Sequence, residues 1–397
     1  MTSRTKKRTS PQKKSAAGSP VETRKVPEAT RCILWGQAGG RCEFPGCNKL
    51  LLEHSVTSKV VNFADVAHVV GFREHGPRGK GKRPAAIHAL ENLMLMSPDC
   101  HKLIDDNPDD FTREMLADFK REHEKRIRHL TGLGPDMGTT IVQLKGLIAA
   151  HTTDIPVSHV YEAVSPRWPT TRQGHVIDLG AINIDGEAGA KLATEHIDAE
   201  VMNLYRPGMD ADKTLHISLF ALAPMPVLMH LGSRLSNKIP VDFFQRHRDT
   251  KSTPWKWRND GPPVGFVVKT LQEGTVRGKV ALVLSLSGSI ARESLPPTID
   301  AQFTIYEMTL DGITPNVDFL RNADTLELFR KDYRRLLADL EKIHGQYDEL
   351  HVFPAVPSPI AVVLGHDLLS KVHPDLLAYD NDRAAGGFKF RLRIIRK

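Results

Sequence analysis

A single break in the sequence pattern constrains the fold of this chain more than any other feature. The segment TGLGPDMGTT (131–140) holds three glycines and one proline and lacks an apolar period, which is typical of a linker. All four cysteines precede it, and residues 141–397 contain none. Because 397 residues suffice for two separate hydrophobic cores, the sequence predicts two folded domains of different character.

The chain is expected to divide into four segments. They are a disordered basic tail (1–25), a first domain (26–131), a linker with lead-in (132–150) and a second domain (151–397). The tail carries eight Lys or Arg residues and one acid, so the rest of the chain holds 46 basic and 46 acidic residues and is formally neutral. Such a tail is either a loose nucleic-acid arm or a solubilising leader.

Cysteine usage and hydropathy indicate the compartment. Four cysteines in a chain of this length do not form a disulfide framework, so we expect a reducing cytoplasm. No apolar stretch approaches the roughly 20 residues that span a bilayer. The first residues also lack the apolar core of a signal peptide. The sequence therefore predicts a cytoplasmic protein with no membrane segment.

Three residues of the first domain stand in an order suited to metal-assisted hydrolysis. His68 lies in an apolar strand pattern, and Asn92 opens the next strand. His101 follows Pro98, at the start of a predicted helix. An imidazole can remove a proton from water, and a second one can bind a divalent cation. Each residue alone is typical of a core, turn or helix surface, so the inference depends on the three together.

The strings AHVV, ENLML and CHKLID, with a basic loop between the first two, resemble the HNH or ββα-metal endonucleases. The resemblance covers roughly residues 31–105 and implies an α+β fold of two strands and a helix. It implies His68 as general base, Asn92 as its orienting partner and His101 as a ligand of Mg²⁺ or Mn²⁺.

One position departs from the pattern of that family. Many relatives carry a second acidic or imidazole ligand directly before the general base, where this chain has Ala67. Asp65 and Glu53 are the nearest acids that could take its place.

The cysteines resemble those of the zinc-stabilised HNH subclass. Cys42, Cys47 and Cys100 would supply three ligands, but Ser97 stands where relatives have the fourth cysteine. Tetrahedral Zn²⁺ needs one more ligand. The sequence leaves three possibilities open: a water completes the site, the knuckle is metal-free, or the fourth ligand is one of His54, His88 and Cys32.

A glycine-rich basic loop (71–85) separates the first two motifs. Cations on such a loop can follow a phosphate backbone without reading bases, so we expect little sequence preference. The resemblance implies double-stranded DNA as the nucleic acid. The predicted DNA contacts are Arg73, Arg78, Lys80, Lys82 and Arg83.

The second domain alternates strands with helices in two similar blocks, which predicts an α/β fold of two related lobes. Ligands of such sheets bind at the carboxyl ends of the strands. Aromatic, amide, guanidinium and hydroxyl groups at these ends are suited to nucleotides, although the two tryptophans are equally typical of a core. The candidate ligand residues are Gln245, Arg246, His247, Trp255, Trp257, Ser285, Ser287, Pro354, Ala355 and Ser358.

This half, over roughly residues 160–397, resembles the SAVED domain through QRHR…WKW, SLSGS and HVFPAVPSP. The resemblance implies two CARF-like, Rossmann-type lobes that bind a cyclic di- or trinucleotide, with cyclic GMP-AMP as one candidate. The whole chain resembles the HNH–SAVED effectors of bacterial anti-phage signalling (CBASS). That family implies a messenger-producing cyclase as functional partner. It also implies that messenger binding drives assembly into a dimer or tetramer, which cleaves DNA.

Two other functions stay open. A restriction-type HNH endonuclease would use its C-terminal domain to read modified DNA, which predicts a strongly basic surface. The formal neutrality of the chain beyond the tail argues against this function. A non-enzymatic sensor with a degenerate nuclease domain is suggested by Ser97 and Ala67, but the presence of His68, Asn92 and His101 argues against it.

Overall fold

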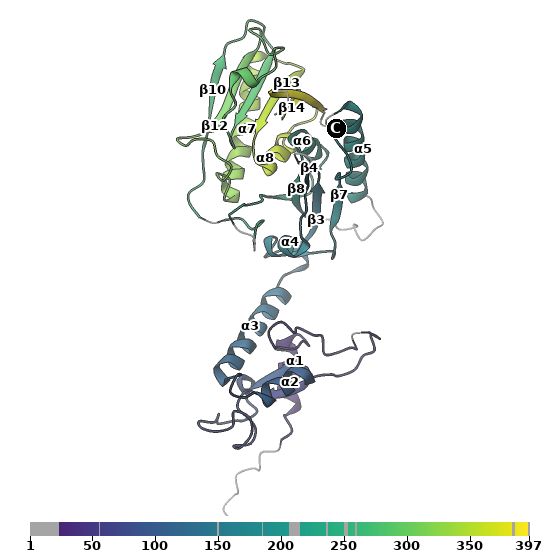
Figure 1. Cartoon of the computed structure of the whole chain (residues 1–397), viewed down its shortest axis with the longest axis vertical. Coiled ribbons are helices and arrows are strands. Elements are labelled where there is room, and N and C mark those ends of the chain that lie inside the picture. Colours follow the sequence, from purple (N-terminus) through teal and green to yellow (C-terminus); the bar gives the residue numbers. More distant parts are fainter. Residues whose placement is uncertain are drawn as a thin grey trace, which may run out of the picture. The chain divides into compact units, whose positions relative to one another are not determined.

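The chain divides into two compact units, residues 1–132 and 133–397 (Figure 1). The computed structural model describes residues 24–54, 56–148, 151–184, 186–205, 215–235, 237–249, 253–258, 260–382 and 386–395. The predicted disordered tail therefore lies outside the described residues, except for Arg24 and Lys25. Among the described helices, none is both long enough and apolar enough to cross a membrane.

The N-terminal unit is built around one antiparallel strand pair that leads directly into a helix. Its elements are α1 (Glu28–Ala38), β1 (Asp65–His68), η1 (Leu90–Asn92), β2 (Leu93–Met96), α2 (Pro98–Asp106) and α3 (Arg113–Thr131). β2 is fully buried and pairs with β1 so that His68 lies opposite Leu93. Ser97 caps α2 by accepting a hydrogen bond from the Cys100 N–H, and Pro98 fits the first helical turn.

The N-cap candidate Thr112 and the basic last turn predict a helix within residues 111–130, and α3 confirms it. The Thr112 hydroxyl accepts a hydrogen bond from the Met115 N–H at its start, and Arg128 and His129 lie in its last turn. His123 is buried and its Nε2 lies 3.0 Å from the Ala38 carbonyl at the end of α1. This contact joins the two longest helices of the unit.

The C-terminal unit has one large sheet in each of two lobes (Figure 1), and β4 and β5 form an additional two-stranded sheet in the first lobe. In the first sheet, β3 pairs in parallel with β6, β7 and β8, and β8 pairs in parallel with β9. The first lobe comprises η2 (Pro135–Met137), β3 (Gly138–Lys145), β4 (Leu147–Ile148), β5 (His151–Thr152), α4 (Val157–Ala163), β6 (Trp168–Pro169), β7 (His175–Asp178), α5 (Glu187–Leu204), β8 (Ile217–Leu222), α6 (Met225–Arg234) and β9 (Val241–Phe244).

The second sheet has the order β10-β12-β11-β13-β14-β15. Its four inner strands are parallel, and an antiparallel strand lies at each edge. The lobe comprises β10 (Phe266–Gln272), β11 (Val280–Ser285), η3 (Arg292–Ser294), β12 (Thr304–Leu310), α7 (Ala323–His344), β13 (Glu349–Ala355), α8 (Ser358–His366), β14 (Asp375–Asp382) and β15 (Gly387–Ile394). The predicted α/β fold of two related lobes is confirmed.

Helices α6 and α8 pack against each other and join the lobes through one hydrophobic core. Each begins directly after a parallel strand, and their sequences repeat one pattern, PMPVLMHLG (224–232) and PSPIAVVLG (357–365). A Cβ at Gly232 would lie 1.9 Å from the Val362 carbonyl oxygen, and one at Gly365 would lie 1.9 Å from that of Met229. The two glycines therefore allow the backbones to touch where the helices cross.

Two sequence predictions about this unit were wrong. Residues 132–150, predicted to be a linker, contain β3, which lies between β6 and β8 in the first sheet. Residues 366–377 resemble a helix in sequence, but Asp375–Asp382 forms β14 because it pairs with β13 and β15. Pairing with distant strands overrode the local pattern in the second case.

Gly232→Ala should lower the free energy of unfolding of the C-terminal unit by about 1–3 kcal/mol, because the methyl group overpacks the helix crossing. Without that crowding, the same change within a helix would stabilise by about 1 kcal/mol, so the sign of the effect is decisive. Chemical unfolding of the full chain measures it. Gly288→Ala is the matched control, since no atom lies within 4 Å of its Cβ position; a stabilised Gly232→Ala variant would contradict the packing argument.

Candidate functional site

Asn92 holds together the two segments that carry the histidines of the N-terminal unit. Its side chain is buried, and its Oδ1 accepts a hydrogen bond from the Val70 N–H at 2.8 Å. Its Nδ2 donates to the carbonyls of Val70 at 3.2 Å and Ile87 at 2.9 Å. These partners lie next to His68 and His88 in the chain, so Asn92 fixes the spacing of both rings.

His68 is positioned as a neutral imidazole. Its Nε2 lies 3.3 Å from Nδ1 of His88, and the His88 ring stacks on Phe72 at 5.7 Å. Burial first, and then the charges of His88 and His101, lower the pKa of His68 to about 4. The ring is therefore uncharged at neutral pH, and Nδ1, which does not face His88, can accept a proton.

His101 lies between two carboxylates. Its Nδ1 is 3.1 Å from Oδ2 of Asp65, and its Nε2 is 3.4 Å from Oδ2 of Asp105. The hydrogen bond with Asp105 and the contact with Asp65 together outweigh burial and raise the pKa of His101. Asp65 comes from β1 and His101 from α2, so the contact depends on the pairing of β1 with β2.

The Asp65 and His101 pair is suited to a divalent cation. Two neighbouring ligand atoms of an octahedral Mg²⁺, each about 2.1 Å from the ion, are about 3.0 Å apart, close to the 3.1 Å seen here. Asp105 would then accept from the other ring nitrogen, as a carboxylate commonly does behind a metal-bound histidine. Glu53, the other acid considered, forms an isolated bridge with Val60 instead, and no contact between it and His101 occurs among the described residues.

The basic loop uses its cations in two different ways. Arg78 donates to the Val69 carbonyl at 3.1 Å and to Asp105 at 2.8 Å, and its side chain is only 4% exposed. Arg83 donates to the Phe72 carbonyl at 2.8 Å. These two predicted DNA contacts are therefore corrected: both guanidinium groups are bound within the unit. The other three, Arg73, Lys80 and Lys82, are exposed.

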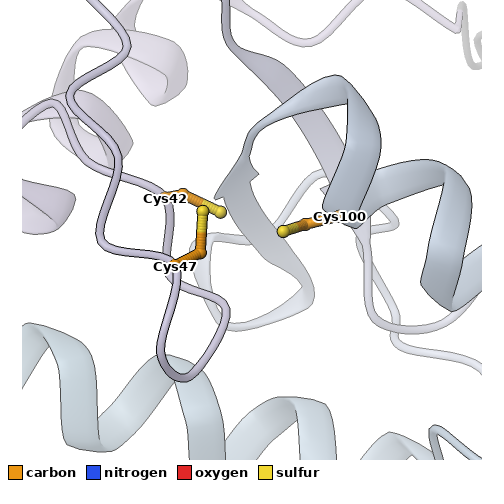
Figure 2. A group of neighbouring side chains, drawn as sticks. All are labelled: Cys42, Cys47 and Cys100. Carbon is orange, nitrogen blue, oxygen red and sulfur yellow. The ribbon is translucent and has the colours of Figure 1, made fainter.

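Cys42, Cys47 and Cys100 form one cluster (Figure 2), with sulfur atoms all within 4.8 Å of one another. The Ser97 hydroxyl lies 3.8 Å from the sulfur of Cys42 and 3.9 Å from that of Cys47, so it occupies the fourth corner. The proposed alternatives lie elsewhere. Among the described residues none of them joins the cluster: His88 pairs with His68, His54 accepts from the Thr57 N–H, and Cys32 is exposed on α1.

The donor set of this cluster suits zinc only in part. Three thiols and one hydroxyl match the number of ligands that tetrahedral Zn²⁺ takes, but a hydroxyl is a weaker ligand than a thiolate. Burial raises the pKa of the Cys100 thiol to about 12. For Cys47, burial is outweighed by hydrogen bonds with the Lys49 backbone and with Cys42, which lower the pKa. A zinc ion would need the thiolate form of all three.

In the C-terminal unit, the strand ends of the second lobe gather several predicted ligand residues. Ser285 of β11 lies opposite Ala355 of β13, and Leu284 lies opposite Pro354. The Ala355 carbonyl accepts from the Ser287 N–H at 2.7 Å. Ser358 begins α8 a few residues later. The SLSGS and PAVPSP segments are therefore brought together at the carboxyl ends of β11 and β13.

The end of β9 carries buried polar atoms without partners. His247 is 7% exposed, and within the described part of the chain its Nε2 has no hydrogen-bond partner. Oε1 of Gln245 is likewise buried without a partner there, while Arg246 is exposed. The half-buried ring of Trp257 lies 6.0 Å from the His247 ring. Unsatisfied buried polar atoms are costly, so they indicate a place where a ligand or water binds.

Trp255 requires a correction. Its side chain is 1% exposed and packs edge-on against Phe220 at 5.3 Å, within a cluster that also contains Phe244. Both faces of the ring are covered by protein, so it cannot stack on a base. Trp255 is a core residue, and only Trp257 keeps partial exposure.

A cavity of about 330 Å³ lies at the carboxyl ends of β3 and β7. Its lining comprises Lys145, Gly146, Thr153, Asp178, Gly180 and Ala181. Lys145, which lines this cavity, forms an ion pair with Asp154 at 3.2 Å. Sequence analysis missed these residues because it assigned β3 to the linker; the alternation of TTIVQLK (139–145) was the available signal.

His88→Gln should raise the pKa of His68 from about 4 toward its ordinary value of 6.5, because it removes a neighbouring group that opposes protonation. Burial, the largest cause, persists, so the rise is partial. Histidine NMR titration of the full chain measures it. His129→Gln, on the exposed end of α3, serves as control. An unchanged His68 titration in His88→Gln would contradict the paired arrangement.

Comparison with known proteins identifies part of the C-terminal unit. No curated protein matches the chain. The Acinetobacter baumannii Cap4 SAVED/CARF-domain containing receptor is similar in structure. Its form with the cyclic trinucleotide 2′3′3′-cAAA aligns at 13% identity and TM-score 0.42, over 75% of this chain and 60% of the receptor. Its form with 3′3′3′-cAAA aligns at 14% identity and TM-score 0.42 over the same shares. This chain thus spans 60% of the receptor's length.

The family model described as "SMODS-associated and fused to various effectors sensor domain" (SAVED) matches residues 201–394. The matched segment begins in the last turns of α5 and runs through β15, so it includes α6, α8 and the whole second sheet. Residues 201–394 of the C-terminal unit are thus similar to the SAVED sensor domains.

Proposed function

We propose that this chain is a metal-dependent DNA endonuclease that a cyclic oligonucleotide switches on. The observation that carries the nuclease part is the β1–β2–α2 arrangement, in which a neutral His68 and an Asp65–His101 pair are held on one strand pair and its following helix. This order and chemistry resemble those of an HNH centre and support the proposal.

The residues of the N-terminal unit divide the chemistry between them. A Mg²⁺ or Mn²⁺ ion, when bound, would stabilise charge on the scissile phosphate and the leaving oxygen. Asp65 and His101 would hold it, and Asp105 would keep the His101 ring oriented. His68 takes the proton of the attacking water through Nδ1, while Asn92 keeps the strand and the loop in register. The exposed cations Arg73, Lys80 and Lys82 would contact the DNA backbone.

The C-terminal unit would supply the switch. A SAVED domain is a sensor fused to effectors, and the strand ends that carry Ser287, His247 and Trp257 offer hydroxyl, imidazole and aromatic groups to a nucleotide. A nuclease with little sequence preference would damage its host unless gated. Messenger binding would drive self-association into a dimer or tetramer, and a bacterial cyclase would produce the messenger.

Plasmid cleavage tests the proposed function. Pure full-length protein is incubated with double-stranded plasmid and Mg²⁺ or Mn²⁺ across a panel of cyclic di- and trinucleotides, including cyclic GMP-AMP, 2′3′3′-cAAA and 3′3′3′-cAAA. Cleavage with one messenger alone is the expected result. Cleavage without any messenger would favour a restriction-type enzyme, and no cleavage under any condition would favour a sensor without nuclease activity.

His68→Ala should lower the cleavage rate about 100-fold or more, because it removes the general base, while messenger-induced self-association persists. The rate is followed by plasmid nicking, and assembly by light scattering. His129→Ala removes an exposed imidazole of the same unit outside the site and should cleave at the normal rate. A His68→Ala variant as fast as this control would show that another group is the base.

We further propose that the cysteine cluster binds zinc with a weak fourth ligand. Ser97→Cys should then bind Zn²⁺ more tightly and raise the melting temperature of the N-terminal unit, because it completes a set of four thiolates. Competition with a chromogenic chelator measures the affinity.

The matched control for this experiment is Cys32→Ser, which changes an exposed thiol outside the cluster. Its zinc affinity should equal that of the parent protein. If Ser97→Cys also equals the parent, or if Cys47→Ser retains full zinc content, the cluster is held by packing and hydrogen bonds rather than by a metal.

A further inference from the structure

Two arginines of the C-terminal unit share one carboxylate. Oδ1 of Asp249 lies 3.1 Å from Nη2 of Arg258, and Oδ2 of the same residue lies 3.1 Å from Nη2 of Arg321. Asp260 also pairs with Arg321 through both of its oxygens, at 2.8 and 2.6 Å. Arg258 is the less exposed of the two arginines, with 15% of its side chain accessible against 33% for Arg321.

The two arginines come from different lobes and meet where strands end. Arg258 lies in the connection that follows β9, and Arg321 lies in the connection between β12 and α7. The Arg258 N–H donates to the Arg321 carbonyl at 2.7 Å, which joins the two connections. The same β12–α7 connection reaches the SLSGS segment, because the Asn316 N–H donates to the Leu286 carbonyl at 3.1 Å. The arginine pair therefore lies in connections that follow the carboxyl ends of strands.

A buried polar atom that lacks a partner in the described part of the chain lies in the segment next to the arginine pair, which indicates a ligand site. His247, which is followed two residues later by Asp249, is buried and keeps an Nε2 without a partner among the described residues. The His247 N–H donates to the Pro254 carbonyl at 2.6 Å, which joins His247 to the segment that leads to Arg258. A buried donor or acceptor beside two guanidinium groups is suited to an anion that carries several oxygens.

We propose that Arg258 and Arg321 form a phosphate-binding site and that Asp249 occupies it in the absence of ligand. A phosphodiester group carries one negative charge and presents two oxygens, as a carboxylate does, so it can replace Asp249 without changing the charge balance of the network. Asp260 keeps Arg321 in place during the exchange. Asp249 is 41% exposed on its side chain, so its release into solvent costs little.

This inference rests on the proposed sensor function and extends it: Arg258 and Arg321 would bind a phosphate in the backbone of the cyclic oligonucleotide. One phosphate would contact an arginine from each lobe. Release of Asp249 would at the same time remove one carboxylate that ties the β9 connection to the second lobe. Replacement of Asp249 by a phosphate thereby couples ligand binding to the loss of the Asp249–Arg321 ion pair.

Inorganic pyrophosphate is the probe, because its use does not depend on the identity of the messenger. Binding to the full-length protein is measured by calorimetry at constant ionic strength, without DNA. Asp249→Asn should bind pyrophosphate about tenfold more tightly than the parent, since two exposed ion pairs no longer compete. Arg258→Gln and the double variant Asp249→Asn/Arg258→Gln should lose this binding.

Asp339→Asn is the matched control, because it removes a carboxylate that pairs with Lys342 on the surface of α7 at 3.0 Å. It should bind pyrophosphate like the parent. Equal affinities of Asp249→Asn, Arg258→Gln and the control would overturn the phosphate site. Plasmid cleavage by the same preparations tests the proposed function separately: a messenger-dependent nuclease whose Asp249→Asn variant shows unchanged pyrophosphate binding would sink this inference alone.

Discussion

The close crossing of α6 and α8 is the contact on which the geometry of the C-terminal unit depends. Because both glycines lack a side chain, each helix approaches far enough to pack on the sheet of the other lobe, α8 on β8 and α6 on β14 and β15. Both helices begin directly after a parallel strand, so the crossing also sets which strand ends face one another. Polar groups at those ends, such as His247 and Ser287, are thus placed by a contact that is itself apolar.

The N-terminal unit achieves its geometry by hydrogen bonds to backbone carbonyls instead. Its β1–β2 pair is short, and the loop between the strands (71–85) has few apolar side chains to bury. Arg78, Arg113 and Asn92 each donate to at least two carbonyls along or beside this loop. Buried donors and acceptors are paired in this way over a segment that no strand pairing would hold. These bonds hold the loop beside the histidine centre, while Ala67, Val69 and β2 pack in the hydrophobic core of the unit.

Local signals allowed part of this structure to be predicted. Caps and periodicity predicted α3, Pro98 marked the start of α2, and a continuous apolar run predicted β8. Partners distant in sequence account for the rest. Glycines around β3 resembled a linker until its parallel neighbours were known, and no local pattern distinguishes a tryptophan that packs edge-on against Phe220 from one that stacks on a base. Asp65 was one of two candidate acids, and only strand pairing placed it beside His101.

Under the proposed function, Arg78 has a consequence for how mutations of the basic loop are interpreted. In sequence it belongs to a run of cations that would be assigned to DNA affinity, yet its guanidinium joins the end of β1 to α2 and to the carboxylate behind the His101 ring. Loss of the Arg78 side chain would remove the ion pair that holds Asp105. The His101 ring, which Asp105 orients, would then be less well positioned. Under the proposed function, an Arg78 variant would cleave DNA more slowly while its affinity for DNA stayed unchanged. A charge-reversal scan of the loop would then attribute a defect of the catalytic centre to DNA binding.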